Sequence, residues 1–182
     1  MRSFTPADRP RLLAVVDAVC AERTWMHTRR YEPTPAWEHA LSRPRCACHL
    51  LLVAVDAHDV VGWCRAFPVI AGVVAEVGIG LLPAYRDHGW GTDMLHATVA
   101  WAQQAGLREL VLTVRADNAR ARHVFTKVGF RPTGVQEGEW EHMVCALEPE
   151  RLPSLARERR TRVARHGASP YPLDATRRAG RI

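Results

Sequence analysis

A strand, a glycine-containing loop and a helix follow one another directly within residues 73–105, and this unit most constrains the fold. Val73 to Leu82 is an apolar, β-prone run, and Thr92 to Ala105 carries apolar residues at helical spacing. Between them, the loop Arg86-Asp87-His88-Gly89-Trp90-Gly91 places glycines at a helix N-terminus. Backbone N–H groups there are unpaired and carry partial positive charge, and glycine lets an anion approach them closely. The unit therefore predicts a phosphate site, to which Arg86 adds a cation.

The rest of the chain alternates between helix-like and strand-like patterns around this unit. The expected elements are helices at 6–23 and 36–41, strands at 49–55, 60–69 and 73–82, a helix at 92–105, a strand at 107–116, a helix at 119–128, and a hairpin at 131–135 and 140–147. This order indicates one α/β domain over residues 1–150, with a mixed sheet and helices on its faces. Residues 151–182 are arginine-rich and lack an apolar stripe, so we expect a flexible C-terminal extension.

The net charge of +6 is concentrated in that extension. Residues 151–182 hold nine arginines and two acids, which leaves 16 basic and 17 acidic side chains in the rest of the chain. The predicted domain is therefore nearly neutral. A basic chain of this kind does not indicate a nucleic-acid-binding surface on the domain itself, and only the extension offers such a contact.

The five cysteines are odd in number and scattered, which is untypical of a disulfide framework. One local cluster, Cys46-Ala47-Cys48-His49, has metal-binding residue types. A structural zinc site needs a second ligand pair at suitable spacing, and none is apparent in the sequence, so we expect no metal. No apolar run approaches the roughly 20 residues that span a bilayer, and the first residues lack an apolar signal segment. A cytoplasmic protein is the expectation.

Two blocks of the sequence together resemble the GNAT acetyltransferase superfamily. Residues 86–91 match the signature Arg/Gln-x-x-Gly-x-Gly/Ala, and 27 residues after Gly91 comes Asn118-Ala119-Arg120-Ala121, followed by Lys127-Val128-Gly129-Phe130. The second block is similar to the family's Asn-x-x-Ala and Gly-Phe pattern. The resemblance covers about residues 50–147 and is closest to phosphinothricin-type small-molecule N-acetyltransferases. It implies a single-domain GNAT fold in which a splayed pair of strands forms the acyl-CoA cleft.

The resemblance also implies which residues bind acetyl-CoA. Backbone groups of the strand before the loop would meet the pantetheine, the loop would take the pyrophosphate, and Asn118 would contact the pantetheine arm. A helix cap is the other interpretation of Asn118, and it does not exclude the first. The implied cofactor-binding residues are Leu81, Leu82, Arg86, Asp87, His88, Gly89, Trp90, Gly91, Thr92, Asn118 and Phe125.

Glu76 is the candidate catalytic base. Acyl transfer to an amine requires a deprotonated amine, and Glu76 is an acid inside an apolar strand. It resembles the glutamate that phosphinothricin-type members use as a general base, usually through water. Burial would raise the pKa of this carboxyl and help it accept a proton. The alternatives are a solvated strand face or an ion pair with an arginine such as Arg65.

Phe125 stands where many members of the superfamily carry a tyrosine that protonates the departing thiolate. Tyr85, Cys64 and His123 are conceivable substitutes for that missing hydroxyl. The alternative interpretation is that the Phe125 ring only packs in the hydrophobic core. A thiolate that leaves without a dedicated acid is also compatible with turnover.

Trp25, Tyr31 and Trp37 lie in the N-terminal helical region, which commonly walls the acceptor pocket in this superfamily. They are candidate substrate-binding residues for an apolar or aromatic amine, and core packing is the alternative.

The expected function is transfer of an acetyl group from acetyl-CoA to a primary amine of a small molecule. The acceptor would be an amino acid, an amino-acid-like toxin or an antibiotic, with Glu76 acting through water. One alternative is a macromolecular acceptor, either a protein amine or aminoacyl-tRNA. Another is a non-catalytic acyl-CoA-binding regulatory module, which Phe125 favours and Glu76 disfavours. A homodimer is compatible with either enzyme.

Overall fold

The computed structural model describes residues 1–147, and the predicted extension at 151–182 lies outside them. The predicted order of helices and strands is confirmed, with a short strand and two 3₁₀ turns added. The elements are β1 (Arg2–Ser3), a 3₁₀ turn (Pro6–Asp8), α1 (Arg9–Ala21), α2 (Pro35–Ser42), β2 (Leu50–Asp56), β3 (Asp59–Ile70), β4 (Val74–Leu81), a 3₁₀ turn (Pro83–Tyr85), α3 (Trp90–Gln104), β5 (Glu109–Arg115), α4 (Ala119–Val128), β6 (Arg131–Glu137) and β7 (Trp140–Ala146).

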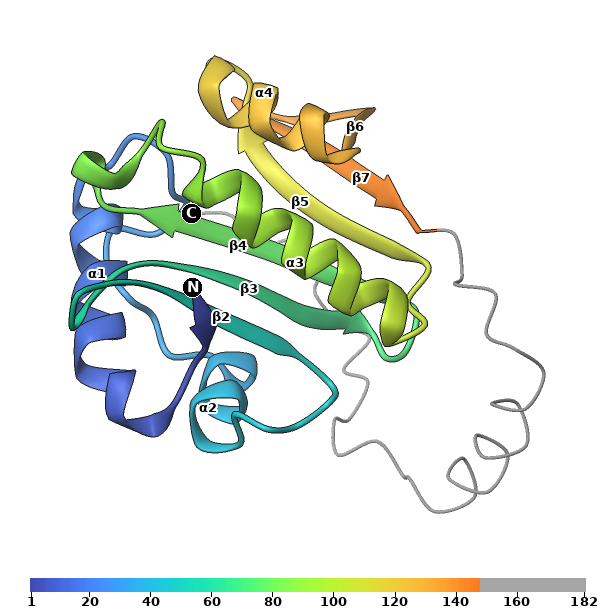
Figure 1. Cartoon of the computed structure of the whole chain (residues 1–182). Coiled ribbons are helices and arrows are strands. Elements are labelled where there is room, and N and C mark those ends of the chain that lie inside the picture. Colours follow the sequence, from blue (N-terminus) through green and yellow to red (C-terminus); the bar gives the residue numbers. More distant parts are fainter. Residues whose placement is uncertain (148–182) are drawn as a thin grey trace, which may run out of the picture. The chain divides into compact units, whose positions relative to one another are not determined.

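All seven strands form one mixed sheet in the order β1-β2-β3-β4-β5-β7-β6 (Figure 1). Neighbouring strands are antiparallel except β4 and β5, which are parallel and are connected through α3. This α/β arrangement confirms the predicted mixed sheet flanked by helices. The parallel pair requires a crossover connection, which is why the strand, loop and helix at 73–105 form one continuous unit.

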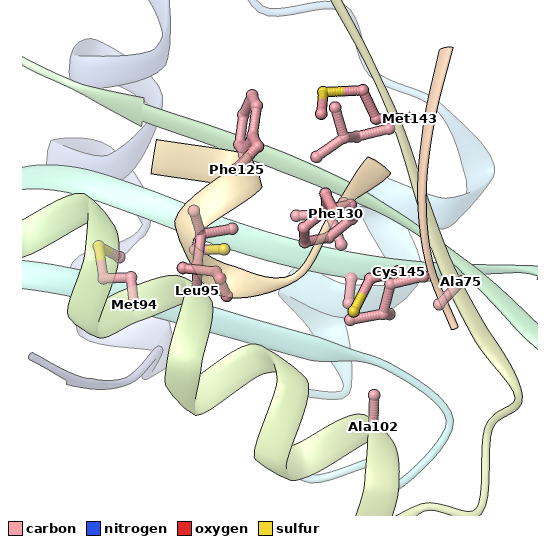
Figure 2. Packing of buried hydrophobic residues seen from close by; sticks show 14 of the residues in the cluster. Ala75, Met94, Leu95, Ala102, Phe125, Phe130, Met143 and Cys145 are labelled. Atoms are coloured by element: carbon pink, nitrogen blue, oxygen red, sulfur yellow. The ribbon is translucent and has the colours of Figure 1, made fainter. Parts of the chain in front are cut away.

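The sheet has a separate hydrophobic core on each face. One core contains α3 and α4 side chains, and Figure 2 shows Met94, Leu95 and Phe125 packed with Phe130 and Met143. The other core contains α1, α2 and aromatic residues of β3. Because helices cover both faces of the sheet at β2 and β3, these two strands contain long runs of buried residues.

The parallel strands β4 and β5 separate after a short paired segment. Their register pairs only Val74 with Glu109, Ala75 with Leu110 and Glu76 with Val111. Both strands continue beyond this point, to Leu81 and Arg115, and they diverge visibly in Figure 1. The predicted splayed pair is therefore confirmed.

Asp8 fixes the first residues of the chain to the start of α1. Its carboxylate accepts two hydrogen bonds from the Arg2 guanidinium, both at 2.6 Å, and a third from the Thr5 backbone N–H at 2.8 Å. These donors hold the pKa of the buried Asp8 carboxyl well below its usual range, the Arg2 hydrogen bonds being the largest cause.

We expect Asp8→Asn to lower the free energy of unfolding by about 2 kcal/mol, because Arg2 loses its charged partner. Since the folded-state pKa is lowered, the stabilisation exists above the ordinary Asp pKa near 4 and is lost as the pH falls below it. Urea unfolding of both proteins at pH 7 and pH 3 measures this. Asp59→Asn is the control, because the Asp59 side chain is 82% exposed in its pair with Arg11. An equal effect of both substitutions would contradict the prediction.

Candidate active site

A cavity of about 880 Å³ lies where β4 and β5 separate. Its walls come from the second half of β4, the loop before α3, the end of β5 and the first turns of α4. Residues 25–27, from the segment between α1 and α2, complete the lining together with Trp140 of β7. The cavity thus connects the N-terminus of α3 with Glu76.

The N-terminus of α3 offers backbone N–H groups to this cavity. Gly89 is the N-cap with φ of +88°, and no side chain caps the helix. The first N–H of the helical ladder is that of Asp93, which donates to the Gly89 carbonyl at 3.0 Å. The N–H groups of Trp90, Gly91 and Thr92 precede that bond. A helix start of this kind can bind a phosphate oxygen.

The predicted loop residues are not all at the cavity. Arg86, Asp87, Gly89, Gly91 and Thr92 line it. His88 is exposed, and its Nδ1 lies 2.6 Å from the Arg86 carbonyl oxygen. The Trp90 ring packs edge-on against Tyr85 with centroids 6.4 Å apart.

Arg86 is held by protein groups. Its guanidinium donates to both carboxylate oxygens of Glu22, at 2.9 and 2.5 Å, and to the Leu81 carbonyl at 2.9 Å. Glu22 is the C-cap of α1, so this ion pair ties the loop to the N-terminal helix. Glu22 and Arg86 are 64 residues apart, and no local pattern predicts their contact. Two cations outside the predicted set, Arg120 and Lys127, also line the cavity.

The backbone of β4 has polar groups on its open side. The Leu82 N–H donates to the Val61 carbonyl at 2.9 Å, which places the Leu82 backbone toward β3. Because antiparallel pairing alternates along a strand, the backbone groups of Leu81, Ile79 and Val77 point away from β3, toward the gap. Of the two predicted pantetheine contacts, only Leu81 lines the cavity.

Two glycines of β4 lie beneath large side chains of β3. Gly78 is paired with Arg65 and Gly80 with Trp63. A Cβ at position 78 would lie 2.8 Å from Arg65 Nε, and one at position 80 would overlap the Trp63 ring. Both glycines line the cavity and were missing from the predicted site. Their alternation within an apolar strand was the available signal, since glycine inside a strand often marks a close approach.

Asn118 and Phe125 both line the cavity. The Asn118 side chain also caps α4 by accepting the Ala121 N–H at 3.1 Å. Phe125 is buried, and its ring centroid lies 5.9 Å from that of Phe130 (Figure 2). Tyr85, Cys64 and His123 do not line the cavity; the Tyr85 hydroxyl donates to Asp56, and Cys64 contacts Thr98 in the core.

Glu76 lines the cavity but is not buried. Its side chain is 48% exposed and lies 3.5 Å from the Arg65 guanidinium. The ion pair weighed as an alternative is therefore present, and the expected burial of Glu76 is not. Arg65 in turn lies over the Phe67 ring, 4.8 Å from its centroid.

His27 lies on the same wall and was not predicted. Its Nε2 is 3.0 Å from Thr113 Oγ1, and its ring stacks on Trp140 with centroids 3.5 Å apart. Burial lowers the pKa of His27, an effect that the charge of Glu76 opposes. The imidazole is therefore mainly neutral at pH 7, and Glu76 lines the same cavity.

The three N-terminal aromatic residues divide between the cavity and the core. Trp25 lines the cavity. Trp37 belongs to the core beneath α1 and α2, where its ring meets Phe67 edge-on at 5.2 Å. The Tyr31 hydroxyl donates to Glu38 at 3.0 Å. For Trp37 and Tyr31, packing within the N-terminal region therefore fits better than binding of the substrate.

The comparisons with known proteins agree with this geometry. The acetyltransferase (GNAT) family model matches residues 13–130. Mycothiol acetyltransferase from Catenulispora acidiphila is 42% identical over 60 residues, which are 32% of this chain and 19% of that protein. The uncharacterized N-acetyltransferase YycN from Bacillus subtilis is 33% identical over 90 residues, which are 48% of this chain and 58% of that protein.

A solved structure, that of YncA from Salmonella typhimurium with its cofactor acetyl-CoA, has the same fold. Its TM-score is 0.68 at 18% identity, and the match covers 84% of this chain and 96% of YncA. The chain belongs to the GNAT acetyltransferase family. The matched part of the chain spans about a fifth of the length of the mycothiol acetyltransferase and about three-fifths of the length of YycN. Within residues 1–147, no helix has the length and apolar character needed to cross a membrane.

Proposed function

We propose that this chain transfers an acetyl group from acetyl-CoA to a primary amine of a small molecule. The observation that carries the proposal is the single cavity that extends from the N-terminus of α3 to Glu76. One end has the chemistry to hold a diphosphate, and the other has a carboxylate that can take a proton. The open strand edge between them can hold an extended, amide-containing arm.

In this proposal the cofactor is held mainly by the backbone. The N–H groups of Trp90, Gly91 and Thr92 take the pyrophosphate, because they are the unpaired donors at the start of α3. Polar backbone groups of β4 bind the amides of pantetheine, as an added strand would bind a sheet edge. Asn118 lies on the opposite side of the cavity. The structure of YncA with its cofactor acetyl-CoA supports the choice of cofactor.

Glu76 acts as the general base through a water molecule. The water removes a proton from the ammonium group of the acceptor and passes a proton to the Glu76 carboxylate. The neutral amine then attacks the thioester carbon, the C–S bond breaks, and an amide forms. The second amine proton leaves to water or with the coenzyme A thiolate. Exposure of Glu76 to the cavity supports this role, because the water can reach it.

Arg65 favours an acceptor that carries an anionic group besides its amine. Its guanidinium is next to Glu76, so an acceptor carboxylate gains an ion pair there while the amine faces the base. Trp25 and Trp140 provide apolar surface on the same side. Amino acids and amino-acid-like toxins have this combination of groups.

An acceptor screen scored by release of the coenzyme A thiol tests the proposal. We expect at least one amino acid or amino-acid-like amine to accelerate thiol release from acetyl-CoA. Activity confined to protein amines or aminoacyl-tRNA would support a macromolecular acceptor instead. Tight acetyl-CoA binding without thiol release on any amine would support a non-catalytic module.

We also propose that residues 1–150 form the catalytic domain and that residues 151–182 are an extension dispensable for it. Deletion of 151–182 is expected to leave kcat/KM on a free amine within about twofold, because every group assigned to the reaction lies before residue 147. A steady-state comparison of the full and shortened chains measures this. A larger loss that is confined to an RNA-linked acceptor would assign the arginines to substrate binding.

Phe125→Tyr tests whether the missing hydroxyl limits the reaction. We expect kcat to stay within about threefold, because a thiol with a pKa near 8.5 leaves readily as thiolate. Single-turnover thiol release at saturating substrates measures the chemical step. A rise of about tenfold or more would show that protonation of the thiolate is limiting, and that a hydroxyl at this position restores it.

A further inference from the structure

Four side chains with metal-binding chemistry meet where α2 ends and β2 begins. His39 comes from α2, Cys46 and Cys48 from the following turn, and His49 from the residue before β2. One ligand atom from each lies within 4.8 Å of all the others. None of the four lines the cavity between β4 and β5, so the cluster is independent of the proposed acetyl transfer.

Two contacts of Cys48 with the histidines have the spacing of ligands around a tetrahedral zinc ion. His39 Nε2 is 3.3 Å from Cys48 Sγ, and His49 Nδ1 is 3.4 Å from the same sulfur. Zinc bonds of about 2.3 Å to sulfur and about 2.0 Å to nitrogen place tetrahedral ligands about 3.3–3.8 Å apart. The Cys48 N–H also donates to Cys46 Sγ at 3.3 Å, which stabilises negative charge on a thiolate.

The sequence-based expectation of no metal depended on a missing second ligand pair. The structure brings that pair together: His49 follows Cys48 directly, and the turn at 43–48 returns the chain to His39. The six-residue gap between His39 and Cys46 belongs to no familiar zinc spacing, so the pattern was not visible in the sequence.

His49 is the buried member of the cluster, and the contact of its Nδ1 with Cys48 Sγ is the one hydrogen bond that its ring makes among the described residues. This residue is 5% exposed, and its Nε2 is buried with no hydrogen-bond partner in the described part of the chain. Its ring lies between His39, at 5.4 Å, and Phe67, at 6.1 Å. The other ring nitrogen, Nδ1, faces Cys48 Sγ and is the one that would bind the ion.

Cys46 and Cys48 are joined by a disulfide in this structure. A disulfide sulfur is not a thiolate ligand, so metal binding requires the reduced chain. A dithiol reductant supplies the two electrons and two protons that convert the disulfide into two thiols and is itself oxidised to a disulfide. Zinc then displaces both protons as two S–Zn bonds form.

We infer that the reduced chain binds one Zn²⁺ through His39, Cys46, Cys48 and His49, as a structural site that fastens α2 to β2. The site has Cys₂His₂ composition and no position left for substrate, which is typical of structural zinc. α2 carries Trp37, whose ring packs on Phe67, so the ion would hold one wall of the N-terminal core in place.

Zinc titration of the full chain, reduced with a phosphine that does not bind the metal, tests this inference. We expect one zinc per chain with a nanomolar or tighter Kd and a higher Tm in the zinc-bound form. Substitution with Co²⁺ should give sulfur-to-cobalt charge-transfer bands and the absorption of a tetrahedral ion. The oxidised chain should bind none.

His39→Asn and Cys48→Ser are the diagnostic variants, because neither residue is in the buried core. Each is expected to weaken zinc binding by about a hundredfold or more and to remove the zinc-dependent rise in Tm. His58→Asn, at the exposed turn between β2 and β3, is the matched control and should bind zinc like the natural chain. Absence of zinc binding by the reduced chain, or equal binding by His39→Asn and His58→Asn, would overturn the inference. Coenzyme A binding checks the folding of each variant and is expected to be unchanged.

Discussion

Replacement of Glu76 by glutamine is expected to lower kcat/KM by about 100- to 1,000-fold, because the isosteric amide cannot accept the proton of the amine. Acetyl-CoA affinity should not change, since the groups proposed to hold the cofactor are elsewhere in the cavity. The rate of Glu76→Gln should recover partly at high pH, where more of the acceptor amine is already neutral. Steady-state kinetics across a pH series, with the best acceptor from the screen, measures both effects.

Glu109→Gln is the matched control for this experiment. Glu109 is an exposed acid at the start of β5, directly opposite Val74 of β4, and it does not line the cavity. Its replacement removes the same charge from the sheet without touching the site. A kcat/KM of Glu76→Gln within threefold of the natural chain would remove Glu76 from the mechanism and leave it as the ion-pair partner of Arg65.

Replacement of Gly89 by valine is expected to raise the Kd for coenzyme A at least about tenfold, equivalent to 1.4 kcal/mol. Gly89 has φ of +88°, a conformation that a β-branched residue adopts only under strain. The loop can relieve the strain by changing shape, and the N–H groups of Trp90, Gly91 and Thr92 then no longer converge on one anion. Calorimetric titration with coenzyme A measures the loss.

Gly72→Val is the control that separates the effect of backbone strain from the effect on coenzyme A binding. Gly72 also has a positive φ, +68°, with no atom near its would-be Cβ, and it lies in the turn between β3 and β4. Both substitutions should reduce the free energy of unfolding by about 1–2 kcal/mol, but only Gly89→Val should affect cofactor affinity. If the two variants bind coenzyme A equally well, the loop at residues 86–91 does not bind the pyrophosphate.

The order of elements could be predicted because most of them carry local signals. α4 has the predicted bounds, since Asn118 caps it and Gly129 ends it with φ of +107°. α3 begins two residues earlier than predicted, because the sequence pattern assigned Trp90 and Gly91 to the preceding loop. β1 was missed altogether: two residues have no periodicity, and their strand exists only because they pair with β2.

The candidate site was predictable from a local pattern at the loop before α3, and from the family resemblance at Glu76, Asn118 and Phe125. The loop before α3 was found because its glycines and its helix are adjacent in the chain. Contacts between distant segments were missed, as for Glu22 with Arg86, or for His27 with Thr113. No local pattern encodes such pairs. Arg65 was named as a possible ion-pair partner of Glu76, and the pairing of β3 with β4 brings the two together, since Arg65 lies opposite Gly78, two residues along β4 from Glu76.

The close approach of β3 to the two glycines of β4 has a consequence for how this sequence can vary. Position 80 has no room for a side chain while the Trp63 ring covers it, and a side chain at position 78 would displace the guanidinium end of Arg65. A single change from glycine would push a cross-strand neighbour off the sheet and so alter the wall of the cavity. Among descendants of this chain, a larger residue at position 80 should therefore arise only together with a smaller one at position 63. Position 72, where the space is open, should change independently of both.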